Sequence, residues 1–220
     1  HMYDMLGQKT PLLYTIRLVV LSVQMPLFLF LSGYFGKHAE KRRRAALGEY
    51  LVPFLLFNTL YYMVRVGQSP ELNYGLLRPL NMYWFLLTLL LIRLLLPELL
   101  RIRRLLPLSI VLALLAGGDR YFGRTLSLSR TVCFFPFYLL GYYCTEAHMK
   151  RIRRLPIPVA LLCGGTGAFL ALWLTDTLHP DGSASHPFQL VNSYETQGLE
   201  PLEGVVFRLS IYLIAPLLGV

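Results

Sequence analysis

An uncharged apolar run that stops at a basic cluster constrains the fold of this chain more than any other feature. The run covers residues 24–36, and residues 37–44 follow at once with five lysines and arginines. An apolar segment flanked by cations is typical of a helix that enters a lipid bilayer and ends at its surface. The chain is therefore expected to fold as membrane-embedded helices whose orientation is set by its basic clusters.

The composition supports this expectation. Hydrophobic residues make up 55% of the 220 residues and charged residues only 15%, whereas soluble domains carry roughly a quarter charged residues. A net charge of +9 would suggest nucleic acid in a soluble protein, but here the cations cluster between apolar runs and no nucleic-acid-binding motif accompanies them. We expect the lipid bilayer, and no nucleic acid, as a partner.

Seven apolar segments can be distinguished along the chain. The sequence therefore predicts an all-α, polytopic transmembrane helix bundle, read as one incomplete domain over residues 1–220. The last segment stops without flanking charges, so we expect the chain to be truncated there. We expect the same at the N-terminus, with further spans beyond both ends. The segments cover residues 18–36, 50–66, 79–97, 105–118, 131–147, 155–175 and 205–220.

The basic clusters all fall on one side of such a bundle. Residues 37–44, 101–104 and 150–154 follow the first, third and fifth segments and hold twelve of the 21 lysines and arginines. Because cytoplasmic loops are enriched in these residues, the clusters are expected in the cytoplasm. The loop 176–204, with five acids and no lysine or arginine, is expected outside.

Four stretches resemble one family in the order in which that family carries them. Residues 24–35 (QMPLFLFLSGYF) are similar to the HMPLFFFxSGYF signature of the acyltransferase 3 family, most closely in its branch of membrane sugar O-acetylases, such as fucose O-acetylase-like proteins. Residues 83–89 (YWFLLTL) and 129–143 (SRTVCFFPFYLLGYY) resemble two further family spans, and residues 51–54 (LVPF) resemble a weaker LxPY element. The likeness is good over residues 1–147 and only general beyond them.

The resemblance implies an activity. Members of the family are multi-spanning enzymes that move an acyl group, often acetyl from acetyl-CoA, onto a sugar or another acceptor of the cell envelope. It therefore implies an O-acyltransferase of a bacterial inner membrane, with acyl-CoA as co-substrate, a sugar or glycolipid as acceptor, no permanently bound cofactor and no metal.

Two residues near the N-terminus bear on the chemistry. The family's key histidine lies about two dozen residues before the M-P-L-F element, which is the position of His1 relative to Met25. His1 is then either the general base that takes the acceptor's hydroxyl proton or a residue left by cloning. Gln24 replaces the histidine that usually precedes M-P. An amide can hydrogen-bond a sugar hydroxyl but cannot act as a base, so Gln24 is either an acceptor contact or an interhelical hydrogen bond.

Other candidate acceptor contacts are Arg17, Trp84 and Arg130. Arginine within or beside an apolar span is costly and favours a function, and an indole ring can stack on a sugar face. The alternatives are anchoring in lipid headgroups for the arginines and an interfacial aromatic belt for Trp84.

The candidate contacts of the acyl donor are basic. Arg42, Arg43 and Arg44 suit the phosphates of CoA, and Arg93 lies near the inner end of the third segment. The alternatives are that the cluster only sets topology and that Arg93 reaches out to the headgroups.

Two other functions are compatible with the same residues. A transporter or flippase for a lipid-linked sugar also uses Gly- and Pro-interrupted spans with polar groups inside the membrane, although the segments show no internal repeat. A catalytically inactive relative would explain Gln24. A metal site at His179, Asp181 and His186 is disfavoured because their spacing is irregular and the stretch is typical of turns.

Overall fold

All regular secondary structure in the part that the structure describes is helical. The computed structural model describes residues 11–66, 75, 77–80, 83–118, 127–178, 194 and 200–218, and the predicted all-α class is confirmed. The elements are α2 (Pro11–Tyr34), α3 (Ala39–Ala46), the π-helical turn η1 (Leu47–Leu51), α4 (Val52–Arg65), α5 (Trp84–Leu99), α6 (Leu105–Leu115), α7 (Leu128–Tyr143), α8 (Glu146–Arg153), α9 (Ile157–Leu178) and α10 (Pro201–Leu218).

Each predicted apolar segment overlaps one of these helices, namely α2, α4, α5, α6, α7, α9 and α10. The two remaining α-helices, α3 and α8, lie in basic clusters that the sequence reading assigned to connections. Within the described residues, no helix combines the length and the hydropathy that crossing a membrane requires. For example, α5 has 16 residues and α6 has 11, against about 20 for a straight span. The prediction of seven membrane spans is therefore not confirmed by the described helices.

The chain divides into two compact units. One comprises residues 36–136, and the other comprises residues 1–35 and 137–220, so the boundary falls inside α7 at Pro136. The prediction of a single domain over residues 1–220 stays a prediction.

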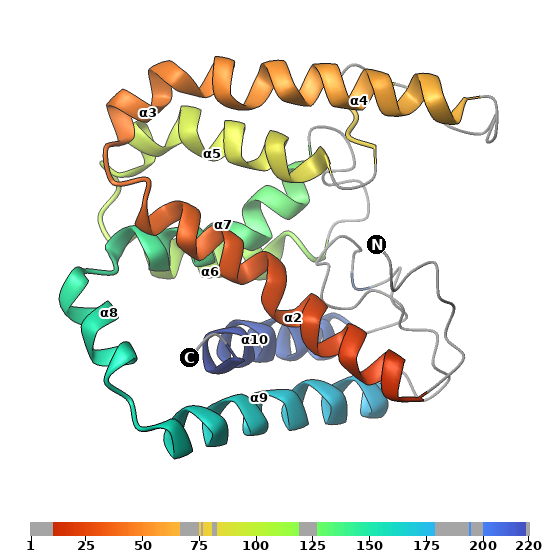
Figure 1. Cartoon of the computed structure of the whole chain (residues 1–220), viewed down its shortest axis with the longest axis vertical. Coiled ribbons are helices and arrows are strands. Elements are labelled where there is room, and N and C mark those ends of the chain that lie inside the picture. Colours follow the sequence, from red (N-terminus) through yellow and green to blue (C-terminus); the bar gives the residue numbers. More distant parts are fainter. Residues whose placement is uncertain are drawn as a thin grey trace. The chain divides into compact units, whose positions relative to one another are not determined.

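In the unit of residues 36–136, α3, η1 and α4 follow one another and pack along α5 (Figure 1). Apolar side chains from both sides form its core, including Phe54 of α4 and Leu87 and Leu90 of α5. Leucine and isoleucine make up most of α5, and both are compatible with a helix buried on most of its circumference. Unlike an α-turn, η1 closes i→i+5 hydrogen bonds and so holds one additional residue.

Asn58 joins the chain segment before α5 to α4. Its side chain is 1% exposed. Its amide nitrogen donates to the Arg78 carbonyl at 3.2 Å, and its amide oxygen accepts from the Leu80 backbone N–H at 2.8 Å. A buried amide with both ends bonded holds this segment against α4.

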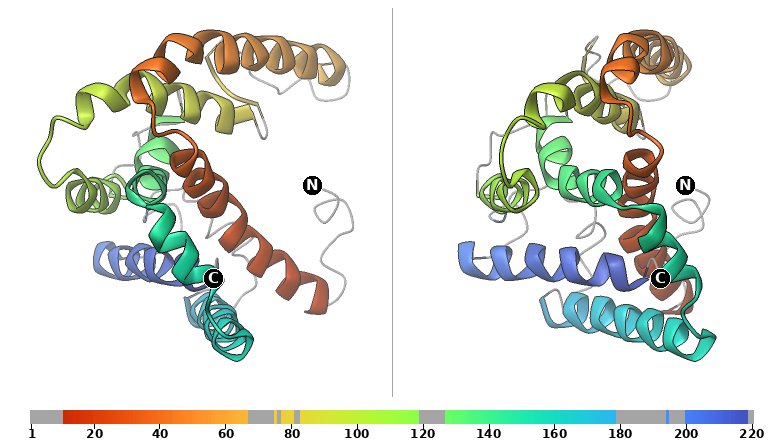
Figure 2. Two further views of the ribbon diagram at one scale, coloured as in Figure 1. Left: turned by 60° about the vertical axis from the view of Figure 1, so that its left-hand side comes forward. Right: turned by 90° about the vertical axis from the view of Figure 1, so that its left-hand side faces the viewer.

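In the other unit, α9 and α10 lie side by side and both contact α2 (Figure 2). Phe137 of α7 packs on Tyr212 of α10, with ring centroids 5.1 Å apart. Gly33 of α2 and Gly141 of α7 allow these helices to approach to backbone contact. Small residues at such crossings are typical of closely packed helices.

Candidate active site

The start of α5 and the first turn of α7 bring together two residues that the sequence predicted as acceptor contacts. The guanidinium carbon of Arg130 lies 4.5 Å from the centroid of the Trp84 ring. On the same indole, Phe134 stacks with ring centroids 5.6 Å apart and an interplanar angle of 24°. Trp84 is only 7% exposed. Because Arg130 and Phe134 are four residues apart on one helix, they share the face that meets Trp84.

Polar contacts also connect α5 and α7 near their first turns. The hydroxyl groups of Thr131 and Thr88 are hydrogen-bonded, with their oxygens 3.2 Å apart. The Thr131 hydroxyl also lies 3.0 Å from the Ser127 carbonyl, to which it donates. The Nε atom of Arg130 is buried and has no hydrogen-bond partner among the described residues. Buried polar atoms are nearly always bonded to protein or to water. A guanidinium held on an indole, with its Nε donor unpartnered among the described residues, is suited to bind an oxygen-rich ligand.

The arginines that the sequence predicted as contacts of the acyl donor, acyl-CoA, lie on α3 and α5. Most of them form ion pairs or hydrogen bonds within the protein. Arg42 forms an ion pair with Glu49 at 3.6 Å, and Arg43 forms one with Glu98 at 3.5 Å. Arg44 is exposed. The ion pairs are about half exposed, so they are weak and open to exchange with a polyanion.

Arg93 is buried rather than extended to a surface. It is 4% exposed, and its guanidinium donates to the Gly36 carbonyl at 3.4 Å. This position argues against the alternative in which Arg93 reaches lipid headgroups. A role toward CoA stays a prediction.

The other predicted site residues are not brought together by the described structure. His1 lies outside the described residues. Arg17 lies on α2, but its side chain is outside the described part. Gln24 is exposed on α2, which neither supports nor excludes an acceptor contact. His179, Asp181 and His186 also lie outside the described residues, and no cluster of potential metal ligands occurs within them.

The sequence indicates Arg208, inside an apolar run, either as an acceptor contact or as an anchor in lipid headgroups, but it reveals neither the partner of this arginine nor the two buried threonines. Arg208 of α10 is 1% exposed, and its guanidinium carbon lies 4.9 Å from the centroid of the Tyr194 ring. Its position inside an apolar run was a signal, but an isolated arginine does not reveal its partner. Thr88 and Thr131 gave no signal, since each stands alone in an apolar segment.

A comparison with protein families identifies the class. The sequence model of a protein family described as an acyltransferase domain matches residues 2–215, nearly the whole chain. The protein is thus an acyltransferase enzyme. The chain belongs to the acyltransferase 3 family, as the resemblance of its segments predicted. No curated protein and no solved structure matches the chain.

Proposed function

We propose that this protein is an integral membrane O-acyltransferase that moves an acetyl group from acetyl-CoA to a hydroxyl of a sugar-containing envelope molecule. The observation that carries the proposal is the contact between Arg130 and Trp84. Trp84 is buried and holds the Arg130 guanidinium in place, and the Nε donor of Arg130 has no partner among the described residues. A guanidinium held in this way can donate hydrogen bonds to the hydroxyl oxygens of a sugar. The family match supplies the acyl-transfer chemistry.

A location in a bacterial inner membrane, with several passes, is part of the proposal. It is supported by the 55% hydrophobic composition and by large apolar side chains that face outward. On α4, Leu56 and Met63 are 60% and 66% exposed, and on α9, Leu161 and Phe169 are 71% and 65% exposed. Exposed apolar faces of this kind mark contact with lipid or with a partner.

Acyl-CoA is the proposed co-substrate, and no permanently bound cofactor or metal is required. Arg42, Arg43 and Arg44 of α3 present three guanidinium groups within one turn of helix. The carboxylate partners of Arg42 and Arg43 are replaceable by the phosphates of CoA, which bind arginine with bidentate, charge-assisted hydrogen bonds. Arg93 is proposed to support this cluster from α5.

The proposed reaction needs one base. The acceptor hydroxyl oxygen attacks the thioester carbonyl, the new C–O bond forms, and the C–S bond breaks. The hydroxyl proton passes to a neutral imidazole, for which His1 is the candidate, and then to the departing thiolate of CoA. Gln24 and Arg17 are proposed as further acceptor contacts.

The test is acetyl transfer in membranes that contain the protein. Radiolabelled acetyl-CoA is supplied, and label in envelope glycans is measured for the wild type, Arg130→Gln, Trp84→Leu and His1→Ala. Arg103→Gln, which removes an exposed cation outside the candidate site, is the matched control. We expect transfer by the wild type and the control, and a loss of at least tenfold in Arg130→Gln and Trp84→Leu, about 1.4 kcal/mol of transition-state binding.

The outcomes separate the parts of the proposal. Transfer that survives His1→Ala removes His1 from the mechanism. Equal transfer by Arg130→Gln and Arg103→Gln would show that Arg130 does not contact the acceptor. No transfer by the wild type, over a range of acyl donors and envelope acceptors, would indicate the inactive relative that Gln24 suggests.

A further inference from the structure

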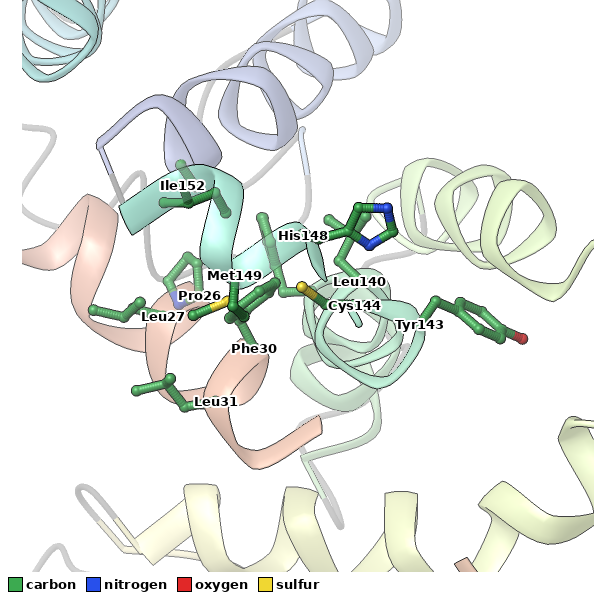
Figure 3. Close-up of a pocket in the computed structure, with 12 residues that line it drawn as sticks. Pro26, Leu27, Phe30, Leu31, Leu140, Tyr143, Cys144, His148, Met149 and Ile152 are labelled. Atoms are coloured by element: carbon green, nitrogen blue, oxygen red, sulfur yellow. The ribbon is translucent and has the colours of Figure 1, made fainter. Parts of the chain in front are cut away.

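An apolar cavity lies in the unit of residues 1–35 and 137–220, and none of the residues assigned above lines it. Its volume is about 500 Å³, within the range of small-molecule sites. Its walls come from α2, the C-terminal end of α7, α8 and α10. Figure 3 shows Pro26 and Phe30 of α2 and Met149 of α8 meeting at its centre, while Tyr143 points away. Such a lining suits a hydrocarbon and offers few partners to a polar ligand.

One wall of the cavity is an amphipathic helix. Met149 and Ile152, three residues apart on α8, line the cavity, and both are half-buried. At about 100° per residue, Arg153 and Arg151 flank this face on its two sides, and both are exposed. Helices with an apolar face and a cationic rim bind at the boundary between acyl chains and phosphate headgroups.

The charge around this wall is strongly positive. Four cations, Lys150, Arg151, Arg153 and Arg154, stand at or just after the C-terminal half of α8, where the helix dipole also favours them. The only acid of α8 is Glu146, in its first turn. A ligand whose chain fills the cavity would therefore present its head to a cationic rim.

The N-terminus of α8 is fixed independently of any ligand. Thr145 caps the helix by accepting from the His148 backbone N–H, and the His148 ring Nδ1 accepts from the Thr145 backbone N–H at 3.2 Å. This reciprocal capping box satisfies two backbone donors. The rim is thus held in place before a ligand arrives.

We propose that the cavity binds the hydrocarbon chain of a lipid phosphate, with the phosphate at the cationic rim of α8. We further assign this lipid as the carrier to which the sugar acceptor is attached, an assignment that rests on the proposed function. Apolar lining and cationic rim together select an anionic amphiphile over a neutral lipid, a free sugar phosphate or a peptide.

The test is direct binding to the purified, detergent-solubilised full chain, which requires no turnover. Radiolabelled farnesyl phosphate is the probe, and farnesol is the same chain without the phosphate. Met149→Trp and Ile152→Trp fill the cavity from α8. Leu162→Trp adds the same ring at a site on α9 that is 69% exposed and serves as the control. The double variant Arg151→Gln/Arg153→Gln removes the rim, and Arg101→Gln/Arg103→Gln removes an equal charge elsewhere.

We expect saturable binding of farnesyl phosphate, weakened about tenfold or more by either cavity-filling variant and unchanged by Leu162→Trp. The rim variant should lose the preference for farnesyl phosphate over farnesol, and its charge control should keep that preference. No saturable binding, or equal losses in the variants and their controls, would overturn the inference.

Competition and turnover distinguish the remaining outcomes. If phosphatidylglycerol vesicles displace the probe as effectively as unlabelled farnesyl phosphate does, the cavity takes bulk phospholipid and the carrier assignment is wrong. Acetyl transfer without probe binding would overturn this inference and leave the proposed function standing. Probe binding without acetyl transfer would confirm the lipid site and overturn the proposed function, together with the carrier assignment.

Discussion

Gly33 of α2 and Gly141 of α7 each lie against the backbone of the other helix. A Cβ atom on Gly33 would overlap the carbonyl of Tyr138, and one on Gly141 would overlap the carbonyl of Phe30. Both glycines belong to segments through which the chain resembles its family, SGYF and LLGYY. The crossing therefore gives these two signature positions a packing role.

The first prediction concerns this crossing. Gly33→Ala and Gly141→Ala should each lower the free energy of unfolding by about 1–3 kcal/mol, because the added methyl group has no space and the helices must move apart. Chemical denaturation in detergent measures the change. Gly164→Ala on α9 is the control, since its Cβ would meet nothing within 4 Å. This change should be neutral or stabilising by up to about 1 kcal/mol. Equal losses at all three positions would contradict the account.

The second prediction concerns Asn58. Asn58→Ala removes a buried side chain that bonds two backbone groups and leaves the Arg78 carbonyl and the Leu80 N–H without it. We expect a loss of about 1–3 kcal/mol in the free energy of unfolding. Leu60→Ala, at a site on the same helix that is 53% exposed, should cost less than about 0.5 kcal/mol. A similar result for the two variants would show that the amide does not hold the segment before α5.

The third prediction concerns the contact of Arg130 with Trp84. A double-mutant cycle with Arg130→Met and Trp84→Leu should give a coupling energy of about 0.5–2 kcal/mol, the range of a cation–π contact that is partly to fully desolvated. The measurement is the unfolding free energy of the wild type and the three variants. Strict additivity would mean that the two side chains do not interact in solution, and would remove the basis of the acceptor site.

The fourth prediction concerns the N-terminus of α8. His148→Ala removes the acceptor of the Thr145 N–H and should destabilise the helix start by about 0.5–2 kcal/mol. His148→Gln should restore most of this loss, because glutamine at the third helical position completes a capping box. Hydrogen exchange of the amides of residues 145–149 reports the change locally. Indistinguishable exchange in the two variants would argue against the reciprocal cap.

The fifth prediction concerns the binding of the acyl donor, acetyl-CoA, by Arg43. If Arg43 exchanges Glu98 for a CoA phosphate, Arg43→Gln should raise the KM for acetyl-CoA about tenfold with little change in kcat, since a charged hydrogen bond contributes about 1.5–3 kcal/mol. The same variant should change the unfolding free energy by less than about 1 kcal/mol, because the ion pair is half exposed. Arg103→Gln is the control, and an unchanged KM in Arg43→Gln would assign the cluster to topology alone.

The sequence predicted the positions of the helices well because long runs of leucine, isoleucine and phenylalanine allow little else. It did not predict α3 and α8, since the runs of cations were interpreted as markers of membrane sidedness or as contacts of CoA and not as helices. The residues themselves favour a helix in both places. α3 (AEKRRRAA) consists of strong helix formers, and α8 begins at a threonine cap.

The candidate site was predicted in part. Trp84 and Arg130 were each selected as acceptor contacts, but their meeting across 46 residues of chain requires the packing of α5 on α7. Asn58 escaped notice because its two partners lie 20 and 22 residues away. Local patterns reveal helices and caps, whereas long-range polar contacts depend on tertiary structure.

The single π-turn η1 between α3 and α4 sets the phase between a cationic helix and an apolar one. It accommodates one residue beyond an α-helical turn, which corresponds to a rotation of about 100° around the common axis. Deleting Gly48, whose Cβ position is open, would turn the arginines of α3 by that angle relative to the outward-facing leucines of α4. Deletion of a single codon would therefore change the direction of all three guanidinium groups and leave the residues of both helices unchanged. Related enzymes could change the direction of this cationic surface by such one-residue deletions.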